Sequence, residues 1–157
     1  MTLKKYRKKR KFKKTLEPRG KISTKKTERP IFVVQEHHAR NLHWDLRLEK
    51  EGVLKSWAIP KIPPLKPDIK RLAMQVEDHP LEYARFKGKI PEGEYGGGTV
   101  KIWDKGHFRT IHQDKNTWEF ELFGKRLKGK YVLVHIKDRW GKPPKKNKWL
   151  FFKITKG

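Results

Sequence analysis

The sequence after residue 30 is a succession of short β-type segments separated by turn signals, with little helical periodicity. Many short antiparallel strands bury their apolar faces by closing into a barrel or packing as a sandwich. The chain of 157 residues is long enough for one domain with a core but leaves little room for a second. We therefore expect a mainly β fold, a compact β-barrel of about eight strands with short flanking helices and hairpins. The candidate strands are Ile31–Glu36, His43–Lys50, Val53–Ile59, Arg71–Glu77, Gly98–Trp103, His107–His112, Thr117–Phe123, Lys130–Lys137 and Trp149–Thr155.

Turn signals predict how several of these strands are connected. Glu51-Gly52 and Lys105-Gly106 each separate two strand-like segments, so we expect two tight hairpins. The stretch IPKIPPLKPD holds four prolines in ten residues and is expected to be a loop, whereas HPLEYARFK has room for one helical turn. The glycine-rich IPEGEYGGGTV lacks the Gly-Lys-Ser/Thr of a nucleotide-binding loop, so we interpret it as a turn pressed against another strand.

The charge of the chain indicates the class of partner. There are 41 Lys and Arg against 17 Asp and Glu, which gives a net charge of +24 and favours nucleic acid or a phosphorylated substrate. No apolar run has the length of a membrane span and no signal-peptide core is present, so we expect no membrane partner. The absence of cysteine excludes a thiolate metal site, and any metal would be held by imidazole and carboxylate.

The first thirty residues carry half of this charge. They contain fourteen Lys and Arg but only Glu17 and Glu28 as acids. We treat 1–30 as a basic N-terminal arm, partly flexible and in contact with DNA, and 31–157 as the β-barrel domain. A disordered, solvated arm and an arm that folds along a phosphate backbone both fit this composition.

The segment EHHARNLHWDLRLE, residues 36 to 49, concentrates the polar side chains of most interest. In a strand, His43, Asp45 and Arg47 share one face, and the apolar residues between them take the other. His37 lies six residues before His43, and a bend at 39–41 would bring it back beside them. A lone histidine is usually structural, but two imidazoles and one carboxylate form a set suited to Mn²⁺ or Fe²⁺, and to Zn²⁺.

His38 points the other way in this strand, and we do not expect it to be a ligand. An H-x-D pattern followed by a third histidine, here His79, is also typical of non-haem iron oxygenases, and that alternative stays open. The guanidinium of Arg47 matches phosphate oxygens and so favours phosphoryl chemistry. Tyr83 lies one helical turn after His79, although the spacing alone does not separate a functional pair from two loop residues. A basic β-barrel that binds nucleic acid without catalysis is the other alternative.

Three stretches of the chain resemble a known family. They are FVVQEHHARNLHWDLRLEKEGVLKSWAIPK, KRLAMQVEDHPLEYARFKGKIPEGEYGGGTVKIWDKG and the arm's YRKKRKFKKTLEP. These resemble the 3′-phosphoesterase domain of bacterial and archaeal DNA ligase D, in a stand-alone form. The resemblance implies a Mn²⁺-dependent enzyme, for which Zn²⁺ or Co²⁺ would also serve, that removes a 3′-terminal ribonucleoside and then a 3′-phosphate from a DNA primer-template. It further implies a monomer in the prokaryotic cytoplasm that works with a DNA ligase and polymerase of end joining.

The resemblance also assigns roles to individual residues. It implies metal ligands at His37, His43 and Asp45, and catalytic residues at Arg47, His79 and Tyr83. In this assignment Arg47 binds the phosphoryl oxygens, His79 is a phosphate donor or the general acid, and Tyr83 orients the phosphate. Further positions implied to bind substrate or phosphate are Gln35, Lys61, Arg71, Arg10 and Glu17, and Glu77 is implied as a supporting polar position.

One position departs from the family pattern. The arm of the family usually reads Lys-Arg-Asp-Phe, whereas this chain has KRKF, with Lys11 where the aspartate is expected. The family links that aspartate, with Arg10 and Glu17, to removal of the ribonucleoside. We therefore expect strong 3′-phosphate removal and weaker ribonucleoside removal, unless Glu17 or Asp114 supplies the missing carboxylate.

Overall fold

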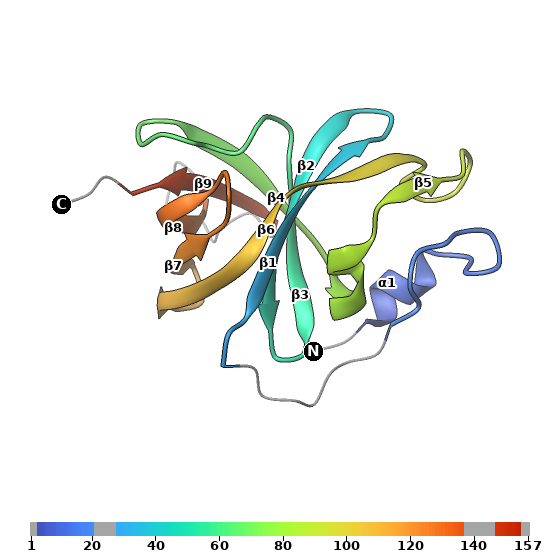
Figure 1. Cartoon of the computed structure of the whole chain (residues 1–157), viewed down its shortest axis with the longest axis horizontal. Coiled ribbons are helices and arrows are strands. Elements are labelled where there is room, and N and C mark those ends of the chain that lie inside the picture. Colours follow the sequence, from blue (N-terminus) through green and yellow to red (C-terminus); the bar gives the residue numbers. More distant parts are fainter. Residues whose placement is uncertain (1–2, 21–27, 137–146, 155–157) are drawn as a thin grey trace.

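The computed structural model describes residues 3–20, 28–136 and 147–154, which form a β-barrel with two short helices beside it (Figure 1). The strands pair in the order β1-β2-β3-β4-β9-β8-β7-β6, and β6 also pairs with β1. These pairings close an antiparallel ring of eight strands, so the predicted barrel is confirmed. A further strand, β5, pairs with the start of β6. The elements are α1 (Lys4–Lys8), β1 (Ile31–His38), β2 (Leu42–Lys50), β3 (Val53–Ile59), β4 (Lys70–Pro80), the 3₁₀ helix η1 (Leu81–Arg85), β5 (Gly88–Ile90), β6 (Gly98–Gln113), β7 (Thr117–Phe123), β8 (Lys128–His135) and β9 (Lys148–Lys153).

Alternation along β2 decides which side chains fill the barrel. Trp44, Leu46 and Leu48 are buried in a large apolar cluster that also contains Trp57 and Phe120. Successive side chains of a strand point to opposite faces, so the residues between them lie on the outer face of the sheet. The outer face of β1 and β2 therefore presents polar side chains although both strands are anchored by the core.

One of the two predicted hairpin turns is present and the other is not. Glu51 and Gly52 connect β2 to β3 and both have positive φ, of 50° and 84°, as a tight hairpin turn requires. Lys105 and Gly106, however, lie inside β6, where they pair with β1, and the predicted turn is wrong. Gly106 serves a different purpose, because a Cβ at this position would lie 2.2 Å from the backbone oxygen of Phe123 in the neighbouring strand.

Other boundaries differ from the expectation by small amounts. The proline-rich stretch is a loop and HPLEYARFK contains η1, as predicted. The strand β5 and the helix α1 were not predicted. The expected strand ends at Lys137 and Thr155 lie outside the described residues, and β8 and β9 end at His135 and Lys153.

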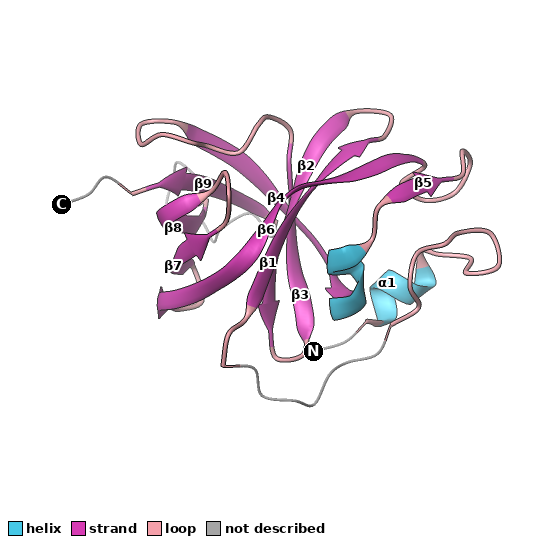
Figure 2. Cartoon of the chain, viewed as in Figure 1, coloured by secondary structure: helices cyan, strands magenta, loops and turns pink. Residues whose placement is uncertain are grey.

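The two helices cover one part of the outer face of the barrel, and Figure 2 shows both on the same side of the strands. A second apolar cluster lies beneath them, separate from the barrel interior, and Tyr6 of α1 and Tyr83 of η1 are both buried in it. This cluster holds the described part of the arm against β1, β3 and η1. None of the helices in the described part of the chain is long and apolar enough to cross a membrane.

Candidate metal and phosphate site

The pairing of β1 with β2 brings together three potential metal ligands. His37 lies directly opposite His43, and Asp45 lies two residues further along β2. One ligand atom of each residue lies within 4.8 Å of the others, with His43 Nε2 3.3 Å and His37 Nδ1 3.6 Å from Asp45 Oδ2. The predicted bend after His38 is therefore a real hairpin, and it assembles the three side chains expected from the sequence.

The second ring nitrogen of each histidine bonds to a backbone carbonyl. His37 Nε2 donates to the oxygen of Gly96 at 2.6 Å, and His43 Nδ1 donates to the oxygen of Asn41 at 2.9 Å. Such bonds fix the tautomer that leaves the other nitrogen free, as is usual for metal-binding histidines. Two imidazole nitrogens and one carboxylate directed at a common point fit a divalent cation. His38 instead forms an exposed side-chain hydrogen bond with Glu36 at 2.5 Å.

The glycine-rich loop before β6 is responsible for the contact to His37. A Cβ at Gly98 would lie 2.1 Å from the oxygen of His38, so only glycine allows this close approach. The interpretation of the loop as a turn pressed against another strand is confirmed. The role of the Gly96 carbonyl was missed, because a backbone acceptor leaves no signal in the residue pattern.

Asp45 is ionised in this setting. Burial by itself would raise the pKa of its carboxyl group, but the charge of Arg47 and the adjacent imidazoles of His37 and His43 outweigh it and hold the pKa far below the usual range. His43 shows the reciprocal effect, since burial would lower its pKa and Asp45 raises it. The carboxylate is thus available as an anionic ligand at every pH of physiological interest.

Arg47 presents a buried nitrogen that is ready for an anion. Its Nε donates to Oε1 of Gln35 at 2.7 Å, and Nη2 lies 3.4 Å from Oδ2 of Asp45. The buried Nη1 has no hydrogen-bond partner in the described part of the chain. An unsatisfied buried donor costs about 1 to 3 kcal/mol, which an incoming phosphate oxygen would recover. The guanidinium also lies over the ring of Tyr83, 4.8 Å from its centroid.

Gln35 supports this arginine and does not face a substrate. Its side chain is completely buried, and Nε2 donates to the carbonyl oxygens of Tyr83 and Phe86 at 2.7 and 3.0 Å. The amide therefore ties Arg47 on the barrel to the backbone of η1. The geometry assigns Gln35 to positioning, whereas the resemblance had implied substrate contact.

His79 lies at the end of β4 beside a second arginine. Its Nδ1 donates to the oxygen of Glu77 at 2.9 Å, so Nε2 accepts from Nη2 of Arg10 at 3.3 Å. Burial, followed by the charges of Arg47 and Arg10, lowers the pKa of His79 well below its usual value. The imidazole is therefore neutral. His79 lies against these cations and outside the group of three ligands, so the third ligand required by the oxygenase alternative is not supplied by His79.

Tyr83 and Glu17 connect the arm to this histidine. The ring of Tyr83 lies 4.7 Å from that of His79, as their spacing predicted, and its hydroxyl donates to Oε2 of Glu17 at 2.6 Å. Arg10 Nε donates to the same oxygen at 2.8 Å. Burial, with the adjacent Glu17, raises the pKa of Tyr83 well above its usual value, so the phenol keeps its proton. Thr15 completes the group by donating to Oε1 of Glu17 at 3.0 Å.

The remaining predicted residues lie at different distances from this cluster. Glu77 pairs with Lys9 at 2.8 Å and so belongs to the contact between the arm and the barrel. Lys61 is exposed just beyond Ile59, the residue that pairs with Trp44, at the end of the barrel where His43 lies. Arg71 is eight residues before His79 on β4, roughly 25 Å along the strand. It donates to the oxygen of Ile62, and the structure does not bring it to the cluster.

Together these features describe a class of protein, a β-barrel with a candidate metal group (His37, His43 and Asp45) beside a buried arginine that could bind a phosphate. The model of one family, the DNA Ligase D 3′-phosphoesterase domain, matches residues 35–135. The multifunctional non-homologous end joining protein LigD of Mycobacterium bovis is 48% identical over 143 residues, covering 88% of this chain and 19% of that protein. The LigD of Pseudomonas aeruginosa is 42% identical over 158 residues, covering 97% of this chain and 18% of that protein.

The chain belongs to the DNA ligase D 3′-phosphoesterase domain family. It spans about a fifth of the length of these curated relatives. The resemblance seen in the sequence is thereby confirmed.

Proposed function

We propose that this protein is a metal-dependent phosphoesterase that processes DNA 3′ ends and removes a 3′-phosphate to leave a 3′-OH. The observation that carries the proposal is the buried Nη1 of Arg47, which has no partner in the described residues and whose guanidinium lies beside the metal group. A phosphate bound there would meet a fixed cation and a metal together. Both are needed to offset the charge of a phosphoryl group in hydrolysis. The names of the relatives, which refer to non-homologous end joining, support DNA ends as the substrate.

His37, His43 and Asp45 would hold the metal, and their donor set suits Mn²⁺, with Zn²⁺ or Co²⁺ as other candidates. When bound, the ion would polarise the phosphoryl group and lower the pKa of a water molecule. The tautomers of both histidines are already set by Gly96 and Asn41. The protein therefore contributes a pre-formed ligand set.

The other residues would act on the phosphate itself. Arg47 donates from Nη1 to a phosphoryl oxygen, and Gln35 keeps its guanidinium in place. In hydrolysis a water oxygen would form a bond to phosphorus and lose a proton while the bond between phosphorus and O3′ breaks, and O3′ must receive a proton. His79 is neutral without substrate, and its Nε2 is the nitrogen that would take up and deliver this proton. A nearby phosphate anion favours the protonated imidazole and so prepares it for this step.

Removal of a 3′-terminal ribonucleoside is the weaker activity in this proposal. Lys11 is exposed next to Arg10, where the family pattern has an aspartate, and a lysine cannot accept hydrogen bonds from a ribose. Asp114 cannot substitute, because it caps the exposed turn between β6 and β7 by accepting from Asn116 and Thr117. Glu17 lies in the site, but its carboxylate is held by Thr15, Arg10 and Tyr83.

A single assay tests the proposal. The protein is incubated with and without Mn²⁺ and with a 5′-labelled primer-template that ends in a 3′-phosphate. We expect metal-dependent conversion to a 3′-OH product by a monomeric protein. Binding without conversion under any metal would support the non-catalytic alternative, and turnover that requires Fe²⁺ and O₂ would support the oxygenase. A DNA ligase and polymerase of end joining are the proposed partners that use the product in the prokaryotic cytoplasm.

A further inference from the structure

A groove on the outer face of the barrel lies beside the phosphate site, on the other side of η1. Its lining includes Arg85 of η1, Ile102, Trp103 and Lys105 of β6, and Lys125 and Arg126 of the turn between β7 and β8. None of these residues takes part in the site described above. The groove is therefore a separate candidate for binding.

The floor of the groove is apolar and its rim is basic. Ile102 and Trp103 are partly buried on the floor, and the guanidinium of Arg126 lies 4.8 Å from the centroid of the Trp103 ring. Arg85 and Lys105 are exposed on the rim. The indole packs against the interior cluster of the barrel and is partly exposed. A partly exposed indole with an arginine over its ring can stack a nucleobase, while the rim cations meet phosphates.

The turn that carries two of these cations is held firmly. The buried carboxylate of Asp104 accepts from the backbone N–H groups of Lys125, Arg126 and Leu127 at 2.8 to 3.1 Å. It also accepts from its own neighbour, Lys105, at 2.9 Å. Among the residues that line the groove, Asp104 is the one acid. Its carboxylate is compensated by these four backbone N–H donors. The rim is therefore electropositive and pre-organised.

The groove lies next to the candidate site, with η1 between them. Val33 lines the groove and pairs with Arg47, and Ala84 lines it next to Tyr83. Along β1, Val33 is four residues from His37, about 13 Å. A nucleic acid strand whose neighbouring end is held at the metal group would therefore reach the groove within a few nucleotides.

We propose that this groove binds a single-stranded nucleic acid segment, such as the template strand that extends past the 3′ end held at the metal group. The inference rests on the proposed function for the position of that end. Duplex DNA does not fit the same features, because its bases are stacked on one another and cannot reach Trp103. A single strand can place bases on the indole and phosphates on the rim at the same time.

The direct test is binding of a labelled eight-residue oligo-dT, followed by fluorescence anisotropy at several salt concentrations. The rim variant is Arg85→Ala with Arg126→Ala, and both side chains are exposed. We expect at least about a tenfold loss of affinity, as removal of a stacking contact brings. The slope of log affinity against log salt should fall by up to about 1.4, since each phosphate contact on a single strand contributes about 0.7.

A matched control removes the same charge elsewhere. Lys70 at the start of β4 and Lys115 in the turn between β6 and β7 are exposed and do not line the groove. Lys70→Ala with Lys115→Ala should change affinity less than threefold. Equal losses in both double variants would overturn the proposal. Trp103→Leu, which keeps an apolar side chain on the floor, should weaken oligo-dT binding, and unchanged binding by that folded variant would also overturn it.

A second measurement separates this proposal from the proposed function. Phosphate release is compared on a primer-template with an eight-nucleotide template extension and on a flush duplex. We expect the rim variant to raise KM for the extended substrate alone. If the wild type releases no phosphate while the rim variant still loses oligo-dT binding, the proposed function is refuted. The proposal that the groove binds a single strand is then still supported. Loss of binding to a poly-glutamate peptide with oligo-dT binding intact would instead identify an acidic protein as the occupant and overturn the proposal.

Discussion

Nη2 of Arg10 lies 3.3 Å from Nε2 of His79, although the two residues are 69 positions apart in the sequence. The arm thus places a cation on Nε2 of His79, the ring nitrogen that does not donate to Glu77. A phosphate group that approaches His79 must either displace this guanidinium or share it. Arg10 remains anchored in both cases, because Glu17 holds its Nε.

The lowered pKa of His79 predicts a specific pH dependence of stability. A histidine in an unfolded chain titrates near pH 6.5. Below that pH, His79 is protonated in the unfolded chain but stays neutral in the folded metal-free chain, because its pKa is lowered there. The free energy of unfolding therefore falls as the pH drops below about 6.5. Urea unfolding should show that the free energy of unfolding decreases less between pH 7.5 and pH 5 for His79→Gln than for the wild type. The exposed His112→Gln is the control, and equal decreases in all three proteins would contradict the prediction.

Metal binding should depend on His43 and not on the neighbouring His38. His43→Ala removes one of the three candidate ligands and should abolish binding of Mn²⁺ measured by calorimetry, together with phosphate release. His38→Ala only breaks an exposed hydrogen bond with Glu36 and should keep both metal binding and phosphate release. Near wild-type binding by His43→Ala at limiting Mn²⁺ would refute the assignment.

Replacement of Gln35 should lower the stability of the fold, although Gln35 does not contact the phosphate in the proposed mechanism. Gln35→Leu removes the side-chain partner of Arg47 Nε and of the Phe86 carbonyl oxygen. The Tyr83 carbonyl oxygen loses one of two donors and keeps the N–H of Phe86. We expect the free energy of unfolding to fall by about 2 to 4 kcal/mol, since one such group costs about 1 to 3 kcal/mol. Denaturant titration measures this effect, and the exposed Gln113→Leu should change it by less than about 0.5 kcal/mol. In the folded variant kcat should drop while metal affinity persists.

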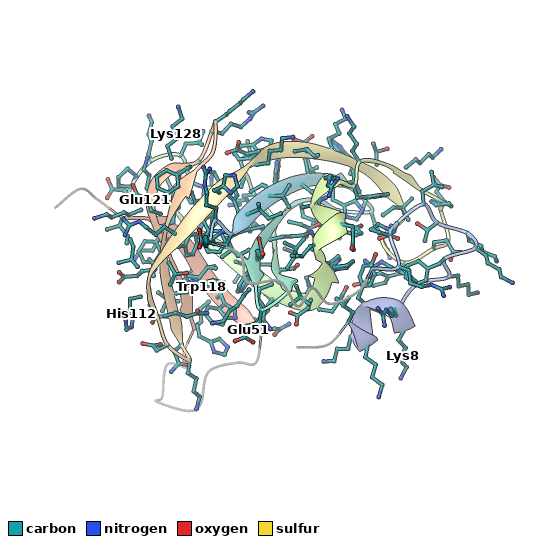
Figure 3. All side chains as sticks on the ribbon, turned by 60° about the horizontal axis from the view of Figure 1, so that its bottom comes forward. Lys8, Glu51, His112, Trp118, Glu121 and Lys128 are labelled. Atoms are coloured by element: carbon teal, nitrogen blue, oxygen red, sulfur yellow. The ribbon has the colours of Figure 1, made fainter. Side chains whose placement is uncertain are left out.

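The exposed lysines of α1 should contribute to DNA affinity through charge alone. Lys5 and Lys8 are exposed, and Figure 3 shows Lys8 projecting from the helix away from the barrel. Lys5→Gln with Lys8→Gln should reduce the salt slope of binding to duplex DNA by up to about 1.8. Deletion of residues 1–30 is a less informative test, because it also removes the buried Tyr6 and Arg10. An unchanged slope would mean that α1 does not contact the DNA backbone.

Lys11→Asp should improve ribonucleoside removal selectively. The substitution restores an acceptor beside Arg10 at an exposed position, so the fold should be unaffected. Rates on primers that end in a 3′-phosphate and in a 3′-ribonucleotide are measured for both proteins. We expect a rise of about tenfold or more on the ribonucleotide primer alone, which corresponds to about 1.4 kcal/mol. Equal wild-type rates on the two primers, or no selective gain, would show that the missing carboxylate does not matter.

The sequence predicted the barrel because its strands alternate cleanly and because turns such as Glu51-Gly52 have a distinct chemistry. It failed at Lys105-Gly106, where a glycine that permits close approach of β7 has the same local pattern as a hairpin turn. No signal within a short window separates these two uses of glycine. The difference lies in contacts with a strand more than fifteen residues away.

The metal group was predictable for a similar reason, since His43 and Asp45 share a strand and His37 is one short bend away. The environment of His79 was not predictable from spacing. Its partner Arg10 comes from a segment whose composition suggests a solvated tail, and the burial of Tyr6 that secures this segment depends on η1. Packing of this kind depends on the surface that the folded barrel and η1 form together, and a short stretch of sequence does not contain that information.

The direct pairing of His37 with His43 has a consequence for how such a chain can change over time. The candidate metal ligands and the core residues alternate along the same two strands, so one register positions both sets. A single inserted residue in β2 would exchange the two faces beyond it, turning Asp45 inward and Trp44 or Leu46 outward. Insertions and deletions in descendants of this chain should therefore be confined to the turn at 39–41 and to other loops, or occur within these strands in steps of two.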